Sequence, residues 1–237
     1  MSLVPTPEDF KEGQLILVNK PLHWTSFDVV NKLRYELKQQ LGIKKIKVGH
    51  AGTLDPLADG LLIICTGKKT KEINDYMGLP KTYSGTITIG ATTPSFDLET
   101  EIDKEFDISH ISEDDIRKTA ASMIGEFDQQ PPIFSAKKVN GKKAYDLARA
   151  GEEVILKTKR VTISQFDITA IDFPNITFEI TCSSGTYIRS IANDFGESLN
   201  NGGYLSSLRR DKIGDFDLKN AKSVEEWIAV IRDGKIS

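Results

Sequence analysis

The sequence lacks most of the residues that metal and redox proteins use. Its 237 residues include only two cysteines, Cys65 and Cys182, and three histidines. Both cysteines lie in apolar, strand-like segments and have no partner at the spacing of a metal site. We therefore expect two buried free thiols rather than a disulfide. The scattered histidines likewise argue against a bound metal ion.

The sequence also lacks a membrane span, a secretory leader and a nucleotide-binding motif. The longest apolar run, 61–65, is too short to cross a bilayer. The amino terminus has no basic head followed by an apolar centre, which argues against secretion. The Gly67-Lys68-Lys69-Thr70 segment is not a phosphate-binding loop, because Leu62 stands where that motif needs its first glycine. We expect a cytoplasmic protein that neither contacts membranes nor carries a cofactor.

The net charge of −3 hides a strong segregation of charge along the chain. Residues 97–115 hold nine acids and one lysine, a net of −8. Residues 129–160 hold eight basic and three acidic residues, a net of +5, and residues 44–71 hold six and two, a net of +4. Solvated faces would explain such runs, but basic segments of this size also bind nucleic acid.

Hydrophobic periodicity predicts one α+β domain over residues 1–237, with a mixed, largely antiparallel sheet flanked by helices. No internal repeat or linker divides the chain. The helix over 26–41 should turn Phe27, Val30, Leu33, Leu37 and Leu41 inward and end at Gly42. Strands are expected over 14–18, 61–65, 81–91, 161–171 and 176–182, further helices over 68–77 and 187–199, and two more behind the caps Ser112 and Ser223.

The stretch from 48 to 60 is unusually rich in glycine and contains one proline, so we expect a shaped loop rather than a helix or strand. It contains Asp55, which Pro56 should hold in an extended conformation. Such an aspartate can be aimed at a substrate, or it can cap neighbouring backbone amides. The residues alone leave both interpretations open.

The sequence from Gly49 to Gly60, Gly-His-Ala-Gly-Thr-Leu-Asp-Pro-Leu-Ala-Asp-Gly, resembles the signature of the bacterial tRNA pseudouridine-55 synthases, the TruB-like family. The resemblance spans nearly the whole chain. It continues through Lys20-Pro21, Lys81-x-Tyr83, 131–141, the segment from Gly185 to Arg189, and Leu208-Arg-Arg210. It implies the pseudouridine synthase fold, with 129–152 as a basic RNA-binding thumb insertion. It also leads us to expect no carboxy-terminal PUA domain after 237.

The resemblance assigns the chemistry to three residues. Asp55 would act as a nucleophile at ribose C1′ or as the base that removes the C2′ proton, and the sequence cannot separate these roles. Arg189 would be its bidentate counter-ion. Tyr83 would stack on the displaced uracil and assist at C5. Considered alone, Tyr83 would be a core aromatic on a strand.

The resemblance also implies residues that bind the substrate. His50 would fill the gap left in the RNA stack, and Tyr187 and Leu208 would line the pocket. Lys20 would lie near the active site, although in isolation an exposed lysine is the simpler interpretation. Phosphates would bind the thumb segment, which carries Lys137, Lys138, Lys142, Lys143 and Arg149. Asp59 departs from the family pattern, which usually has a small or hydroxylated residue there.

These features predict an isomerase that converts uridine 55 in the tRNA T-loop, extruding the nucleotide to reach it. The expected partner is the T-arm of tRNA, with no metal, no cofactor and no obligate protein partner, and the expected state is a monomer. Two alternatives stay open: a tRNA-binding folding chaperone with little turnover, and a pseudouridine synthase acting on another RNA.

Overall fold

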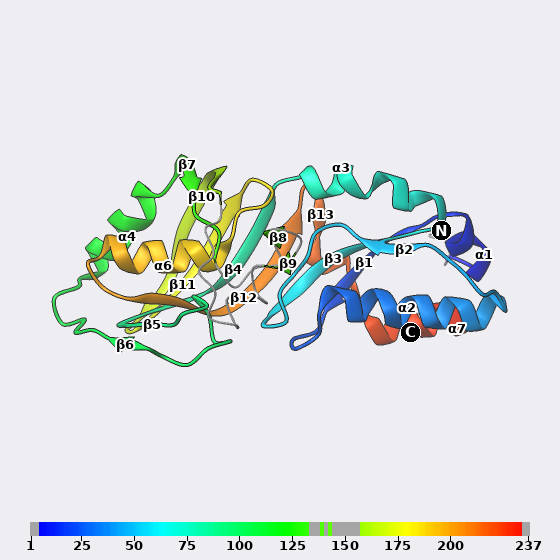
Figure 1. Cartoon of the computed structure of the whole chain (residues 1–237), viewed down its shortest axis with the longest axis horizontal. Helices are drawn as coiled ribbons and strands as arrows, with labels where there is room; N and C mark the ends of the chain where they lie inside the picture. Colours follow the sequence, from blue (N-terminus) through cyan, green and yellow to red (C-terminus); the bar gives the residue numbers. More distant parts are fainter. Residues whose placement is uncertain (1–4, 133–137, 140–141, 144–156, 234–237) are drawn as a thin grey trace. The chain divides into compact units, whose positions relative to one another are not determined.

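The computed structural model describes residues 5–132, 138–139, 142–143 and 157–233 (Figure 1). Its internal contacts divide the chain into two compact units. Unit 1 comprises Met1–Tyr83 and Arg209–Ser237, and unit 2 comprises Ser84–Leu208. Two strands, β4 (Lys81–Ile89) and β12 (Gly203–Ile213), have residues in both units.

Unit 1 is built on a mixed sheet around β3 (Ala58–Thr66). This strand pairs antiparallel with β1 (Leu15–Lys20) and with β2 (Val48–His50). On its other edge β1 pairs in parallel with β14 (Lys222–Ser223), and β13 (Phe216–Asp217) pairs antiparallel with the end of β12. A parallel pair within an antiparallel sheet agrees with the mixed sheet expected from the sequence.

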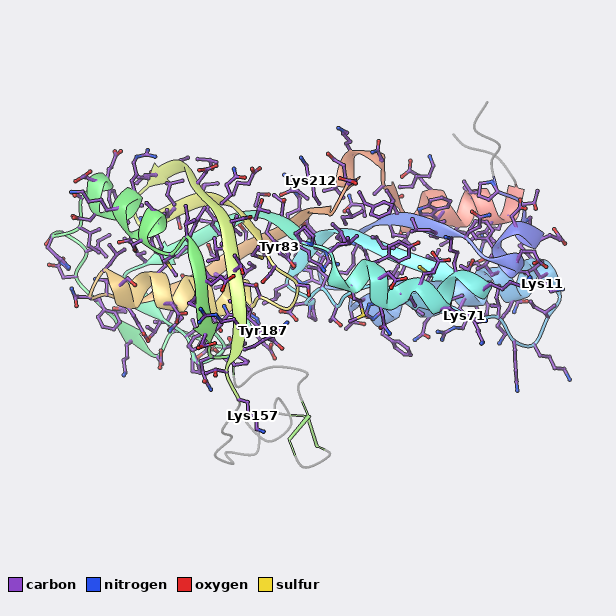
Figure 2. The ribbon with its side chains drawn as sticks, turned by 90° about the horizontal axis from the view of Figure 1, so that it is seen from above. Lys11, Lys71, Tyr83, Lys157, Tyr187 and Lys212 are labelled. Atoms are coloured by element: carbon purple, nitrogen blue, oxygen red, sulfur yellow. The ribbon has the colours of Figure 1, made fainter. Side chains whose placement is uncertain are left out.

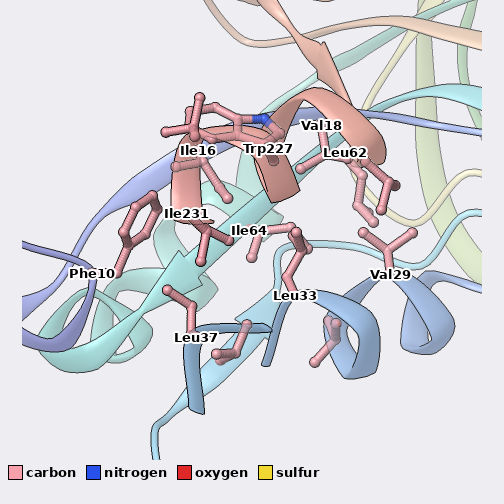
Figure 3. Close-up of a cluster of buried hydrophobic side chains, with 14 residues drawn as sticks. Phe10, Ile16, Val18, Val29, Leu33, Leu37, Leu62, Ile64, Trp227 and Ile231 are labelled. Atoms are coloured by element: carbon pink, nitrogen blue, oxygen red, sulfur yellow. The ribbon is translucent and has the colours of Figure 1, made fainter. Parts of the chain in front are cut away.

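Successive residues of β3 point to opposite faces of the sheet, and both faces are buried. Leu62 and Ile64 contribute to a cluster beneath helices α1 (Pro7–Glu12), α2 (Ser26–Leu41) and α7 (Val224–Asp233), shown in Figure 3. The alternate residues Leu61 and Ile63 pack on the other side, together with residues of α3 (Ile73–Gly78), which follows the 3-10 helix η1 (Gly67–Glu72). A strand buried on both faces reads as a continuous apolar run, which is why β3 is so apolar in sequence.

Helix α2 starts and ends where the sequence predicts, but one of its inward residues was assigned wrongly. Thr25 and Asp28 form a capping box, and Gly42 ends the helix in the left-handed conformation with φ 61°. The buried face of the helix includes Val29, and Phe27 lies outside that face. The Phe27 side chain is therefore 59% exposed and lies beside the Arg34 guanidinium.

Unit 2 is a sheet with the strand order β12-β4-β11-β10-β7. Its antiparallel hairpin, β10 (Lys159–Asp172) and β11 (Asn175–Cys182), confirms the predicted pair of strands. Helix α4 (Glu113–Ser122) packs on β10, and α6 (Ile188–Ser198) places Phe195 5.8 Å from Phe166, measured between ring centroids. The remaining short elements are β5 (Ala91–Thr92), β6 (Lys104–Glu105), β7 (Gly125–Gln129), β8 (Lys138–Val139), β9 (Lys142–Lys143) and the 3-10 helix η2 (Leu218–Asn220).

Several local predictions are confirmed and others need correction. The α+β class holds, Ser112 and Ser223 cap their helices, and both cysteines are buried free thiols. The 48–60 stretch is a loop only in its middle, since β2 reaches residue 50 and β3 begins at residue 58. The 68–77 segment begins as a 3-10 helix, and Met77 and Ile124 are exposed.

Candidate active site

Asp55 lies in the short loop 51–57, between β2 and β3, and main-chain hydrogen bonds fix that loop at both ends. The Ala51 amide donates to the Ile63 carbonyl at 2.9 Å, and the Ala58 amide donates to the Asp55 carbonyl at 3.1 Å. In addition, the His23 amide donates to the Pro56 carbonyl at 2.7 Å. The Asp55 side chain is half-buried on a loop whose backbone is tied to its surroundings.

Ser26, the first residue of α2, pins the residue that precedes Asp55. Its hydroxyl accepts a hydrogen bond from the Leu54 amide at 2.8 Å and donates to the Leu54 carbonyl at 3.1 Å. Both side chains are buried. One hydroxyl thus satisfies both backbone groups of a residue that has no strand partner, as buried polar groups require.

Arg210 holds the same loop from β12. Its guanidinium donates to the Thr53 carbonyl at 3.3 Å, to the Gly52 carbonyl at 3.2 Å and, through Nε, to the Leu61 carbonyl at 2.8 Å. The residue is only 1% exposed. The sequence contains a signal for this contact, since Arg210 closes the Leu208-Arg-Arg210 motif, but its role as a loop clamp was not predicted.

Lys20, which is fully buried, lies in the field of the Asp55 and Asp59 carboxylates. Its amine donates to the Pro21 carbonyl at 2.9 Å and to the Trp24 carbonyl at 2.6 Å. Burial lowers the pKa of Lys20 to about 8, and the charges of Asp59 and Asp55 oppose that shift. The interpretation of Lys20 as an ordinary exposed lysine is therefore wrong.

His50 and Tyr83 also belong to unit 1. Burial lowers the pKa of His50, the nearby Arg210 charge lowers it further, and the Gly52 backbone opposes both, so the ring is neutral at pH 7. Its buried Nδ1 has no hydrogen-bond partner among the described residues. Tyr83, labelled in Figure 2, is 8% exposed at the start of β4.

Arg189 lies in unit 2, on the first turn of α6, and is paired with a carboxylate that sequence reasoning missed. Its Nη1 lies 3.4 Å from Oδ2 of Asp97, and both side chains are 7% exposed. The same nitrogen donates to the Ser95 carbonyl at 3.4 Å. Asp97 begins the acidic stretch that suggested a surface loop, but it is itself buried, so its acidic neighbours concealed it.

The start of α6 is fixed by a second missed residue, Gln129 at the end of β7. Its side-chain amide donates to the Tyr187 carbonyl at 3.0 Å and accepts from the Tyr187 amide at 2.8 Å. Tyr187 itself is half-buried, as is Leu208 on β12 (Figure 2 labels Tyr187). Buried Gln129 thereby sets the position of the turn that carries Arg189.

Two of the basic residues expected to grip RNA, Lys137 and Arg149, lie outside the described residues. Lys138 is in β8, whose backbone pairs antiparallel with β9. Among the described residues, no group of three histidine, cysteine or acidic side chains is placed to hold a metal ion, and no helix is both long and apolar enough to span a membrane.

The fold is that of solved pseudouridine synthase structures. The chain matches a protein in the archaeal box H/ACA sRNP Nop10-Cbf5 complex with a TM-score of 0.66 and 21% identity, over 95% of this chain. It matches one in a Cbf5-Nop10-Gar1 complex with a TM-score of 0.69 and 23% identity, over 97% of this chain. The chain spans only 56% and 60% of those two proteins, so these likenesses concern the fold alone.

The sequence defines the family more narrowly. The model of the TruB family pseudouridylate synthase N-terminal domain matches residues 38–188. A protein of Flavobacterium johnsoniae called tRNA pseudouridine synthase B is 56% identical over 217 residues, which are 91% of this chain and 95% of that protein. One of the same name from Phocaeicola vulgatus is 51% identical over 223 residues, 93% of this chain and 95% of that protein. The chain belongs to the TruB family.

Proposed function

We propose that this chain is an isomerase that converts uridine to pseudouridine in tRNA, at position 55 of the T-loop. The observation that carries the proposal is the placement of Asp55. It is the only carboxylate in the loop 51–57, and Ser26 and Arg210 fix the residues just before it. Relatives that share half of this sequence carry the name tRNA pseudouridine synthase B.

The reaction rearranges bonds without oxidation or reduction. The bond between ribose C1′ and uracil N1 breaks, the uracil turns, and C1′ bonds to C5, while the C5 proton is lost and N1 gains one. Asp55 serves either as the nucleophile at C1′ or as the base that takes the C2′ proton. Because the uracil never leaves the pocket, one carboxylate suffices where a glycosidase that adds water uses two.

The other residues support this step. We assign Tyr83 the stacking contact with the displaced uracil, and we assign Arg189, which pairs with Asp97 in unit 2, the role of a positive charge in the reaction. Neutral His50 takes the place of the extruded nucleotide in the RNA stack, because an uncharged ring loses little solvation when it is enclosed by bases. Tyr187 and Leu208 enclose the base, Lys20 supplies a positive charge near Asp55, and Lys137 and Lys138 bind phosphates. We place the reaction in the cytoplasm and assign it to a monomer that needs no cofactor.

The test compares two amide substitutions in one segment. Asp55→Asn should lower the single-turnover rate on a T-arm transcript by at least about 10⁴-fold, because the amide neither attacks C1′ nor removes a proton. Asp59→Asn makes the same chemical change four residues away and should leave the rate within about tenfold. Carbodiimide modification followed by primer extension locates the product, and tritium release from C5-labelled uridine measures the rate.

The same assay separates the alternatives. A substrate with cytidine at position 55 should give no product, whereas a synthase for another RNA would leave the original transcript unmodified as well. A chaperone without turnover would refold tRNA equally well with Asp55→Asn, and the wild type would release no tritium. Full activity of Asp55→Asn would refute the assignment.

A further inference from the structure

We infer that Arg210 is a positioning residue for catalysis, whose guanidinium holds the Asp55 loop in the position that the reaction needs. The inference rests on the proposed function, because it assigns Arg210 a role in placing the carboxylate of that reaction. It concerns unit 1 alone, where Arg210, the loop and β3 all lie.

The contacts of Arg210 join two segments that no single smaller side chain could join. Nε bonds Leu61 on β3, while the two terminal nitrogens bond the carbonyls of Gly52 and Thr53, three and two residues before Asp55. The planar fork of a guanidinium presents donors in fixed directions, so all three bonds form together or weaken together. Moving the loop relative to β3 would break this set.

Two glycines lie beside Arg210, one in the loop and one on β3. Gly52 has a φ of 99°, and a Cβ there would lie 3.8 Å from Nη1 of Arg210. At Gly60, with φ 104°, a Cβ would lie 2.5 Å from the Arg210 carbonyl oxygen, so β3 runs directly against the Arg210 backbone. Gly60 permits a close approach that other residues would prevent, whereas at Gly52 the positive φ is what favours glycine.

Burial of this cation is costly, and packing alone does not explain it. Its hydrogen bonds to Gly52, Thr53 and Leu61 all go to neutral main-chain carbonyls, and the residue is 1% exposed. Well-packed apolar residues usually serve a purely structural core position at least as well as a buried charge. The charge of Arg210 also lowers the pKa of His50 and of Lys20, which places the cation beside two other residues of the candidate site.

Arg209 gives a matched control in the adjacent position. It is exposed and pairs with Asp211 at 2.7 Å, so Arg209→Ala removes the same side chain without touching the loop. Under single turnover with saturating tRNA, Arg210→Ala should lower the rate constant about 100-fold, the effect expected of a displacement of about 1 Å in a catalytic group. The tRNA dissociation constant should change less than about threefold, and Arg209→Ala should leave the rate constant unchanged.

Chemical rescue separates positioning from folding. Guanidinium chloride at about 20 mM, far below denaturing concentrations, should restore the Arg210→Ala rate about tenfold or more by occupying the vacated site. Ammonium chloride at the same concentration should not, because it lacks the planar fork. Arg210→Lys keeps the charge but loses the three-way geometry, and it should fall between wild type and Arg210→Ala.

Several outcomes would overturn the inference. One is an Arg210→Ala protein that turns over like wild type, and another is one that loses tRNA affinity but keeps its rate constant. If Arg210→Ala fails to fold, Arg210→Lys decides the matter, because a wild-type rate constant in a folded Arg210→Lys protein shows that the fork is dispensable. An inactive wild type would instead contradict the proposed function, so the two failures are distinguishable.

Discussion

The buried cations of the two units differ in their partners. In unit 1, the amine of Lys20 and the guanidinium of Arg210 donate to main-chain carbonyls. In unit 2, Arg189 donates to the Ser95 carbonyl and in addition lies beside the carboxylate of Asp97. A cation bonded to carbonyls shapes the backbone around it, whereas a cation beside a carboxylate has its own side chain fixed by the partner.

The difference follows from the elements that carry the functional groups. Asp55 is on a loop without strand pairing, so its position depends on bonds to the loop backbone. Arg189 is on a helix whose backbone is already fixed, and Gln129 secures the start of that helix. What remains to be set on α6 is the direction of one long side chain, and Asp97 sets it.

The largest effect expected from this comparison comes from Asp97. Asp97→Asn removes the negative charge beside buried Arg189, and truncating one member of a buried charge pair typically costs about 2 to 5 kcal/mol. We therefore expect the single-turnover rate to fall at least about 30-fold. The rate on a T-arm transcript measures this.

The control for that experiment is Asp114→Asn, which changes an exposed carboxylate of the same unit that pairs with Lys118. It should leave the rate unaltered, because the exposed pair of Asp114 with Lys118 contributes little. Equal rates for Asp97→Asn and the wild type would show that α6 alone positions Arg189, and the contrast between the units would then fail.

The next effect is a pH dependence of stability that comes from Lys20. Its pKa falls from the ordinary 10.5 to about 8 in the folded protein. Below pH 8 both states hold the proton. Between pH 8 and 10.5 the unfolded state binds more protons, so the free energy of unfolding should rise with pH, by up to about 3 kcal/mol.

Urea unfolding at intervals between pH 7 and 10.5 tests this prediction. Lys20→Met removes the titrating group, and Lys20→Arg keeps a cation throughout that range, so the contribution from residue 20 should vanish in both. If both variants follow the wild-type curve in parallel, Lys20 does not titrate in this window. Asp59→Asn removes a charge that favours the protonated amine and should move the rise to lower pH.

Glu36 tests the comparison within unit 1, because the buried carboxylate of this residue has counter-ions. It lies 2.8 Å from Arg232 and 3.1 Å from Lys32. Burial raises its pKa, but the bonds from Lys32 and Arg232 outweigh burial and leave the pKa below 4.5. Its stabilising contribution is therefore complete above pH 4.5 and disappears as the pH falls through the lowered value.

Glu36→Gln should lower the free energy of unfolding by about 1 to 2 kcal/mol at pH 7, since both partners are partly exposed. The difference from wild type should shrink toward pH 3, and urea titrations at pH 7 and pH 3 measure it. If the difference in the free energy of unfolding were the same at both pH values, packing around Glu36, rather than its charge, would stabilise the contact between α2 and α7.

Much of the fold could be predicted because it follows from local rules. The apolar run 61–65 and the alternation over 176–182 mark buried strands, and Ser112 and Ser223 precede helices as caps. Phe27 was misplaced because five apolar positions at helical spacing fit more than one face, and only the three-dimensional core decides between them.

The site was harder to predict than the fold. Motif resemblance could name Asp55, Lys20 and Arg189, but no local rule pairs Arg189 with a residue 92 positions earlier in the chain. The burial of Lys20 was missed because a lone lysine usually points to solvent. Arg210 and Ser26 were missed as clamps because their partners are backbone carbonyls, which carry no sequence signal.

The smallest effect is expected at Phe27, on the outer surface of α2. Phe27→Ala should change the free energy of unfolding by less than about 1 kcal/mol, because the side chain is 59% exposed. The Arg34 guanidinium lies 6.0 Å from the ring centroid, and such an exposed cation–π contact contributes little. Leu33→Ala, in the fully buried stripe of the same helix, should cost about 2 to 5 kcal/mol. Urea unfolding measures both variants. Comparable losses of unfolding free energy would mean that Phe27 is buried in solution and belongs to the inward face of α2.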